Sequence, residues 1–255
     1  MSADLSAVAL SVAMATAAGL VGCFAVMRRM TLASDAISHV ALPGIALALL
    51  LHVQPFVGGL VALLLGTLLI WIVESRTRMA TETVIGVVFS AALAVGAMFT
   101  RGEDLIEALF GGAGALPGWE LALGLLGAVG VVIFVLGARH HLVLALLSPD
   151  LARSAGVRVE RLSLLYLLAF SFTVALGLRY LGVLLMGSLI IIPAATAKHV
   201  ARGLGSMLTV AVAVAVSATL VGTALARALH RETGPVIITV AASLFFLALL
   251  RRRPP

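Results

Sequence analysis

Charged residues are scarce in this chain of 255 residues. Only 11% of its residues are charged and 62% are hydrophobic, and the mean hydropathy is +1.20. A soluble globular domain is typically about 45–50% apolar and about 25% charged. The scarcity of charge therefore excludes a soluble domain and predicts an integral membrane protein.

Cysteine and lysine occur once each. Cys23 cannot form a disulfide within the chain, and we expect it to be a small core residue of the first apolar run. Lys198 does not follow a glycine-rich loop, so the chain carries no P-loop for ATP. The other basic residues are arginines in short loops between apolar runs, which excludes the clustered basic surface of a nucleic-acid-binding protein.

Long apolar runs dominate the rest of the chain. The N-terminus lacks the basic segment and cleavage site of a signal peptide, so we expect the first run to be a retained span. A membrane helix needs about 17–25 residues. Runs of that kind lie near 5–27, 31–52, 56–73, 82–99, 119–137, 162–179, 181–198, 205–228 and 235–250. This pattern predicts an all-α polytopic membrane protein with a single transmembrane domain over 1–255.

The predicted number of spans is nine, with eight as the alternative. The sixth and seventh runs are short, and only Arg179, Tyr180 and their neighbours separate them. With nine spans, thirteen basic residues fall in the loops on one side of the membrane and four in the loops on the other. Because basic loops stay in the cytoplasm, this bias places the N-terminus outside and the C-terminus inside.

A polar pair interrupts the second run. Asp35 and His39 lie four residues apart, a spacing that puts both side chains on one face of a helix. A carboxylate within a bilayer costs at least about 2.5–3.5 kcal/mol, so its presence suggests a use. An oxygen ligand and an imidazole on one face can bind a divalent metal ion in transit.

Prolines fall inside two of the predicted spans. Pro43 and Gly44 follow His39 by one turn, and Pro193 lies in the seventh run. Proline removes a backbone donor and kinks a membrane helix. We expect these positions to be kinks that could serve gating.

The cytoplasmic segment 139–161 contains the signature of a short capped helix. Ser148 stands at the N-cap, Pro149 at the first helical position, Asp150 in the first turn and Gly156 at the end. A helix that begins and ends within a loop is suited to docking on a partner. On the outer side, segment 101–118 carries the acidic residues Glu103, Asp104 and Glu107, whose role stays open.

The supply of ionisable groups constrains the energy source. Asp35 is the one carboxylate expected within a span, because the other acids lie at span ends or in loops. Coupling to a proton or sodium gradient usually needs more buried ionisable groups than this. The chain therefore fits a permease that a separate ATPase drives.

Six segments resemble one protein family in order and spacing. The family is the metal-ion permease family of bacterial ABC importers for zinc, manganese and iron. The segments are 28–44 (RRMTLASDAISHVALPG), 82–90 (ETVIGVVFS), 109–111 (LFG), 148–157 (SPDLARSAGV), 182–197 (GVLLMGSLIIIPAATA) and 233–240 (TGPVIITV). The resemblance covers about residues 5–250, essentially the whole chain.

The resemblance implies a multi-pass permease of the bacterial inner membrane that is not itself an enzyme. It implies a second copy of the permease, two cytoplasmic ATP-binding subunits and an extracytoplasmic metal-binding protein that hands over the ion. It implies that Asp35 and His39 form the transmembrane metal site and that the segment near 148–157 docks on the ATPase. The docking residues so implied are Ser148, Pro149, Asp150, Leu151, Arg153 and Gly156.

One chain supplies two metal ligands, whereas zinc usually takes four. We therefore expect two protomers to bring their pairs together at a shared axis. His52, at the outer mouth of the second run, is a weaker candidate ligand. No permanent cofactor is expected, and nothing in the residues separates zinc from manganese or iron.

Three other functions remain as alternatives at this point. A secondary transporter would take its energy from an ion gradient. A membrane metalloenzyme would need further ligands in this one chain, such as a second histidine pair within a span. A scaffold subunit would give no reason for an intramembrane carboxylate.

Overall fold

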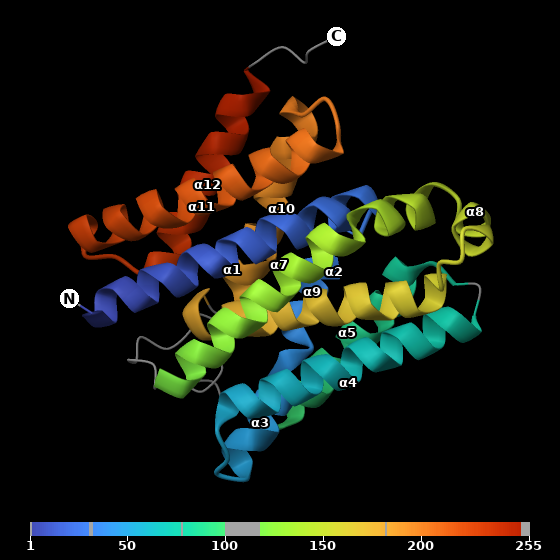
Figure 1. Cartoon of the computed structure of the whole chain (residues 1–255). Helices are drawn as coiled ribbons and strands as arrows, with labels where there is room; N and C mark the ends of the chain where they lie inside the picture. Colours follow the sequence, from blue (N-terminus) through green and yellow to red (C-terminus); the bar gives the residue numbers. More distant parts are fainter. Residues whose placement is uncertain (1, 31–32, 78, 100–117, 182, 251–255) are drawn as a thin grey trace.

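The fold is all-helical in a computed structural model that describes residues 2–30, 33–77, 79–99, 118–181 and 183–250 (Figure 1). The helices are α1 (Ser2–Met27), α2 (Ala33–His39), α3 (Ala41–Leu50), α4 (Pro55–Arg76), α5 (Thr81–Phe99), α7 (Gly118–Leu147), α8 (Pro149–Ser154), α9 (Val159–Leu181), α10 (Val183–Val200), α11 (Leu204–Leu229) and α12 (Thr233–Leu249). The acidic segment with Glu103, Asp104 and Glu107 lies outside the described residues.

Every predicted apolar run coincides with helix. Among the described residues, seven helical stretches are long and apolar enough to cross a membrane, one of them being α2 and α3 together. Two shorter apolar helices, Met186–Val200 and Thr233–Leu249, cover the seventh and ninth predicted runs. The count of nine spans and the orientation of the termini stay predictions.

One predicted boundary is wrong. The fifth run was expected to end at residue 137, but α7 continues to Leu147. Arg139, His140 and His141 therefore lie on a helix and not in a loop. The apolar run ends at these three residues, but leucine and alanine after them sustain the helix.

The second predicted span is two helices joined at Val40. Pro43 has no N–H to donate to the carbonyl of His39, four residues before it. At the junction, the Val40 N–H donates to the carbonyl of Ile37, three residues before it, at 3.0 Å. This spacing is that of a turn tighter than an α-helix. The interruption thus lies just before Pro43, whereas α10 continues through Pro193.

Helix α1 is the centre of the bundle. It contacts α7, α9, α10 and α11, and it is among the most buried of the apolar helices. Polar links fix it in place: the Tyr166 hydroxyl donates to the carbonyl of Val21 at 3.1 Å, and the Cys23 thiol donates to the carbonyl of Met207 at 3.6 Å. Cys23 is fully buried, so the prediction of a core cysteine is confirmed.

Small residues let neighbouring helices approach closely. A Cβ added at Gly44 of α3 would lie 2.2 Å from the carbonyl oxygen of Gly58 of α4, and the reverse distance is also 2.2 Å. Only glycine at both positions permits this crossing. Farther along α4, the Thr67 hydroxyl donates to the carbonyl of Leu63 at 2.7 Å. Since that donation uses the Thr67 proton, the Ser171 hydroxyl of α9 is the donor in its own short contact with Thr67.

The loops between the helices lie at two opposite ends of the bundle. In Figure 1, α1, α4 and α7 run toward the end at which α8 lies, and α9 starts there. Most of the basic loop residues belong to this end, which the charge distribution predicts to be cytoplasmic. Among the exposed large apolar side chains, many belong to α4, α5, α7 and α11, so these helices offer apolar faces to lipid or to a partner.

Candidate metal centre and docking helix

The two predicted metal ligands lie on the same short helix. Asp35 is in the first turn of α2, and His39 is its last residue. The Nε2 atom of His39 lies 3.9 Å from the Oδ1 atom of Asp35. That separation is too long for a hydrogen bond, so the two atoms face one another without being joined.

His39 is packed into the protein. Its side chain is 14% exposed, and its ring lies 5.7 Å from the ring of Phe89 on α5, centroid to centroid. Its Nδ1 atom is buried and finds no hydrogen-bond partner among the described residues. A buried polar atom without a partner costs about 1–3 kcal/mol. The imidazole therefore has one nitrogen near Asp35 and a second that is unsatisfied within the described chain.

Asp35, by contrast, is open. Its side chain is 56% exposed although it belongs to an apolar helical stretch. Its backbone lies against α10, because a Cβ added at Gly187 would be 3.1 Å from both the N and the Cα atom of Asp35. The Ser34 hydroxyl donates to the carbonyl of Gly187 at 3.4 Å and ties the two helices together. Helix α10 thus holds the backbone of α2 while the carboxylate stays accessible.

These two side chains can supply one oxygen and one nitrogen ligand to a divalent ion. Within the described residues, no group of three or more His, Cys, Asp or Glu side chains could hold a metal ion. His52 is not brought to the pair: it follows α3 in the turn to α4, with φ of 53°, and the length of α3 is about 15 Å. A complete ligand shell around Asp35 and His39 therefore needs groups from outside the described chain.

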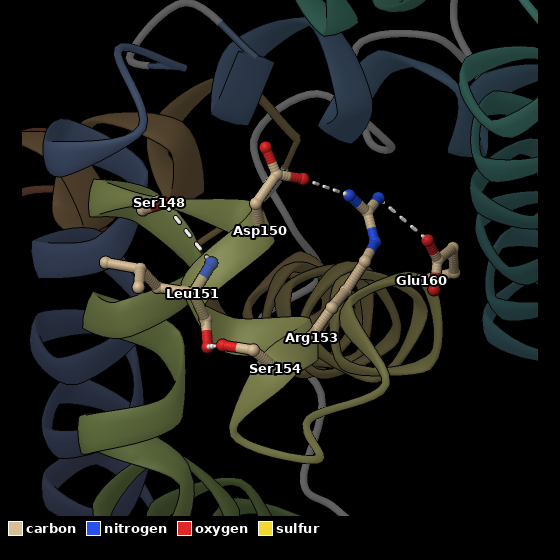
Figure 2. A network of polar contacts seen from close by, with 6 residues as sticks. All are labelled: Ser148, Asp150, Leu151, Arg153, Ser154 and Glu160. Carbon is tan, nitrogen blue, oxygen red and sulfur yellow. Dashed lines mark hydrogen bonds and ion pairs between the residues drawn. The ribbon is translucent and has the colours of Figure 1, made fainter.

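The second predicted site, near 148–157, is the short helix α8 between α7 and α9 (Figure 2). The Leu151 N–H donates to the Ser148 hydroxyl at 3.3 Å, and Pro149 occupies the first turn. At the other end, Gly156 has φ of 81°, in the left-handed region that glycine adopts freely. The predicted capped helix is confirmed.

Charged side chains tie α8 to the start of α9. Arg153 donates from Nη1 to Asp150 and from Nη2 to Glu160, both at 3.0 Å. The hydrogen bond to Glu160, with that to Asp150, raises the pKa of Arg153 above its ordinary value. Leu151 is 61% exposed on the same short helix. Helix α8 therefore presents the apolar Leu151 on one side and, on the other, Arg153 bridging two carboxylates (Figure 2).

Sequence reasoning did not assign a role to Gly187 or Phe89, which both contact the metal pair. Each lies within a segment that carries the family resemblance, and that is the signal that could have found them. Gly187 serves as the contact point of α10 on α2, and Phe89 packs against the His39 ring. Neither contact follows from residue spacing, because each joins helices that are distant in sequence.

Comparisons with known proteins identify the family of the chain. The ABC 3 transport family matches residues 3–252. The manganese import system permease protein ScaB of Streptococcus parasanguinis is 31% identical over 242 residues, which are 93% of this chain and 86% of that protein. The high-affinity zinc uptake system membrane protein ZnuB of Haemophilus influenzae is 31% identical over 238 residues, which are 91% and 90% of the two chains.

A solved structure matches the whole fold. PsaBC from Streptococcus pneumoniae in complex with Fab superimposes with a TM-score of 0.81 at 26% identity, covering 96% of this chain and 90% of that chain. By sequence and fold, the chain belongs to the ABC 3 transport family and is a multi-pass membrane permease of an ABC transporter, not itself an enzyme.

Proposed function

We propose that this permease imports a divalent transition-metal ion, manganese, zinc or iron, and that Asp35 and His39 bind the ion on its way through the membrane. The observation that carries the proposal is the pair itself. An open carboxylate and a buried imidazole share a short helix that ends inside an apolar stretch. The named relatives are permeases for manganese and zinc, which agrees with an oxygen and a nitrogen ligand.

A second copy of the chain would complete the site. A carboxylate that faced lipid would cost at least about 2.5–3.5 kcal/mol. The exposed side chain of Asp35 is therefore expected to face a water-filled pathway or the same residue of a second protomer. Two protomers would contribute two carboxylates and two imidazoles, which meets the four-ligand requirement of zinc. An ion bound at such a shared site could leave again when the protomers move.

The energy would come from ATP hydrolysis by separate subunits. The chain carries no P-loop, and α8 lies at the end of the bundle where the basic loops gather. Two cytoplasmic ATP-binding subunits docked on two copies of α8 would transmit their closure to α7 and α9, between which α8 is fixed. An extracytoplasmic binding protein would deliver the ion at the opposite end.

Uptake by membrane vesicles tests this function. Vesicles holding this chain with its ATPase and its extracytoplasmic binding protein would receive manganese, zinc and iron in competition. We expect ATP-dependent accumulation that falls at least about tenfold in the Asp35→Ala and His39→Ala variants, because each removes one of two ligands per chain. The matched controls are Glu232→Ala and His230→Ala, which remove exposed side chains from the opposite end of the molecule.

Two outcomes would contradict the proposal. Normal uptake by the Asp35→Ala, His39→Ala double variant would show that the pair does not bind the ion during transport. Uptake that ignores ATP but collapses with the proton gradient would identify a secondary transporter instead. Size-exclusion chromatography of each variant checks that loss of uptake does not reflect loss of assembly.

A further inference from the structure

An apolar groove opens between α4, α7 and α9 on the surface of the bundle. Its volume is about 340 Å³. Its lining includes Leu64 of α4, Gly130 and Phe134 of α7, and Leu168 of α9. In Figure 1, α9 lies between α7 and α4, and all three helices contribute lining residues.

The groove lies at the depth of the hydrocarbon core. Its residues come from the middle of three helices that are each long and apolar enough to span the membrane. A Cβ added at Gly130 would meet nothing within 4 Å. The protein therefore leaves this space open where water is absent, and something apolar must fill it.

The chemistry of the groove favours a hydrocarbon chain. All of its lining residues are apolar or glycine, so none offers a side-chain hydrogen bond to a polar occupant. A single acyl chain of a membrane lipid is thin and flexible enough to lie along such a groove.

Polar side chains beyond one end of the groove indicate which headgroup the lipid carries. Three such side chains stand seven residues from a groove residue. Trp71 follows Leu64 on α4, His141 follows Phe134 on α7, and Arg161 precedes Leu168 on α9. Seven residues are two helical turns, so each shares its groove residue's face and lies about 10 Å farther along the helix. All three lie toward the end that carries α8 (Figure 1).

These three side chains suit the interface of a bilayer. His141 and Arg161 are exposed. Trp71 is partly buried and donates from its indole nitrogen to the carbonyl of Glu160 at 3.0 Å, which fixes α4 beside the start of α9. Tryptophan is enriched at membrane interfaces, and a basic residue there attracts anionic lipid. Half of the hydrocarbon core of a bilayer is about 15 Å thick. A lipid whose headgroup lies at these three side chains could therefore place its acyl chain in the groove.

We infer that the groove between α4, α7 and α9 binds one anionic phospholipid, with an acyl chain in the groove and the phosphate near Arg161 and His141. The site is separate from Asp35 and His39, and it requires only that the chain spans a bilayer. The lipid would belong to the leaflet at the α8 end, so it would sit beside the element proposed to dock on the ATPase.

Native mass spectrometry of the purified permease tests this inference. The protein would be mixed with equal amounts of phosphatidylglycerol and phosphatidylcholine that carry the same two long acyl chains. We expect one tightly bound phosphatidylglycerol per chain. The Arg161→Gln variant should lower the preference for phosphatidylglycerol about fivefold, the factor that one basic residue contributes near a membrane surface.

A second variant tests the groove itself. Gly130→Leu fills open space and should reduce binding of both lipids. Gly205→Leu is its control, because a Cβ there also meets nothing within 4 Å but lies on α11, away from the groove. Arg139→Gln is the control for Arg161→Gln, since Arg139 is an exposed arginine at the same end of the bundle and faces away from His141 on α7.

Several results would overturn the inference. Equal binding of the two lipids by the unaltered protein would remove the role of Arg161 and His141. Equal lipid binding by the Gly130→Leu and Gly205→Leu variants would show that the groove is not the binding site. If Gly130→Leu changed the subunit composition and left lipid binding intact, a protein segment would be the occupant. Tight binding of a phosphatidylglycerol with six-carbon chains would also contradict it, and this measurement needs no variant.

Discussion

Asp35 and His39 differ in environment more than their shared helix face suggests. The carboxylate is 56% exposed and the imidazole 14% exposed. The difference follows from the packing of α2, whose contacts include α10 beside Asp35 and α5 beside His39. Phe89 packs against the imidazole, whereas the carboxylate stays open. The proposed site would thus combine one packed and one open ligand, which is suited to release as well as binding.

Among single residues, Gly187 provides the most specific prediction. A side chain there would press on the backbone of Asp35, because its Cβ would lie 3.1 Å from the Asp35 N and Cα atoms. We expect Gly187→Val to reduce ATP-dependent metal uptake at least about tenfold, since overpacking of about 1–3 kcal/mol would displace α2. Uptake and metal binding by vesicles measure the effect. Gly205→Val is the control, and equal uptake by the two variants would contradict the prediction.

The short helices α2 and α8 interrupt the long ones at the two candidate sites. α2 ends where Pro43 leaves the carbonyl of His39 without its helical partner. α8 is bounded by the Ser148 cap and by Gly156 in the left-handed region. Each element is a separate short piece of helix within a longer helical stretch. Movement of α8 would reach α9 through the Arg153–Glu160 ion pair.

Charge reversal on α8 tests its docking role. We expect Arg153→Glu to uncouple ATP hydrolysis from transport, because it places a negative charge beside Asp150 and removes the link to Glu160. Metal binding at Asp35 and His39 should stay unchanged. The measurement is the ratio of ATP hydrolysed to ion imported in vesicles. The control is Arg202→Glu, an exposed position between α10 and α11. Unchanged coupling by Arg153→Glu would remove the docking role.

The whole molecule is a helical bundle with a charged asymmetry between its ends. Because α1 is buried by four neighbouring helices, it holds the bundle together from within. The helices α4, α5 and α7 around it offer apolar faces to their surroundings. Basic loop residues gather at the α8 end, and the positive-inside rule predicts that this end is cytoplasmic.

Labelling of introduced cysteines tests this orientation. The natural Cys23 is buried, so it should not compete for the reagent. We expect Ser154→Cys in α8 to react with a membrane-impermeant maleimide only from the cytoplasmic side, and Glu232→Cys, before α12, only from the outside. Both native side chains are exposed. Reaction of the two cysteines from the same side would contradict the predicted odd number of spans between them.

Residue patterns alone were sufficient for the helical class, the membrane location and the capped helix at 148–156. These features depend on local physics: apolar run length, and the side chains that satisfy helix ends. The Asp35–His39 pair could be predicted for the same reason, because a spacing of four residues fixes both side chains on one face.

Only the tertiary structure decided what surrounds these features. The place of α10 against Asp35, the ring of Phe89 on His39 and the Gly44–Gly58 crossing all join helices that are distant along the chain. The groove between α4, α7 and α9 likewise exists only once three separate spans pack together. Interactions within a helix repeat with its period and can be predicted from the sequence, whereas contacts between helices depend on how the whole bundle fills its volume.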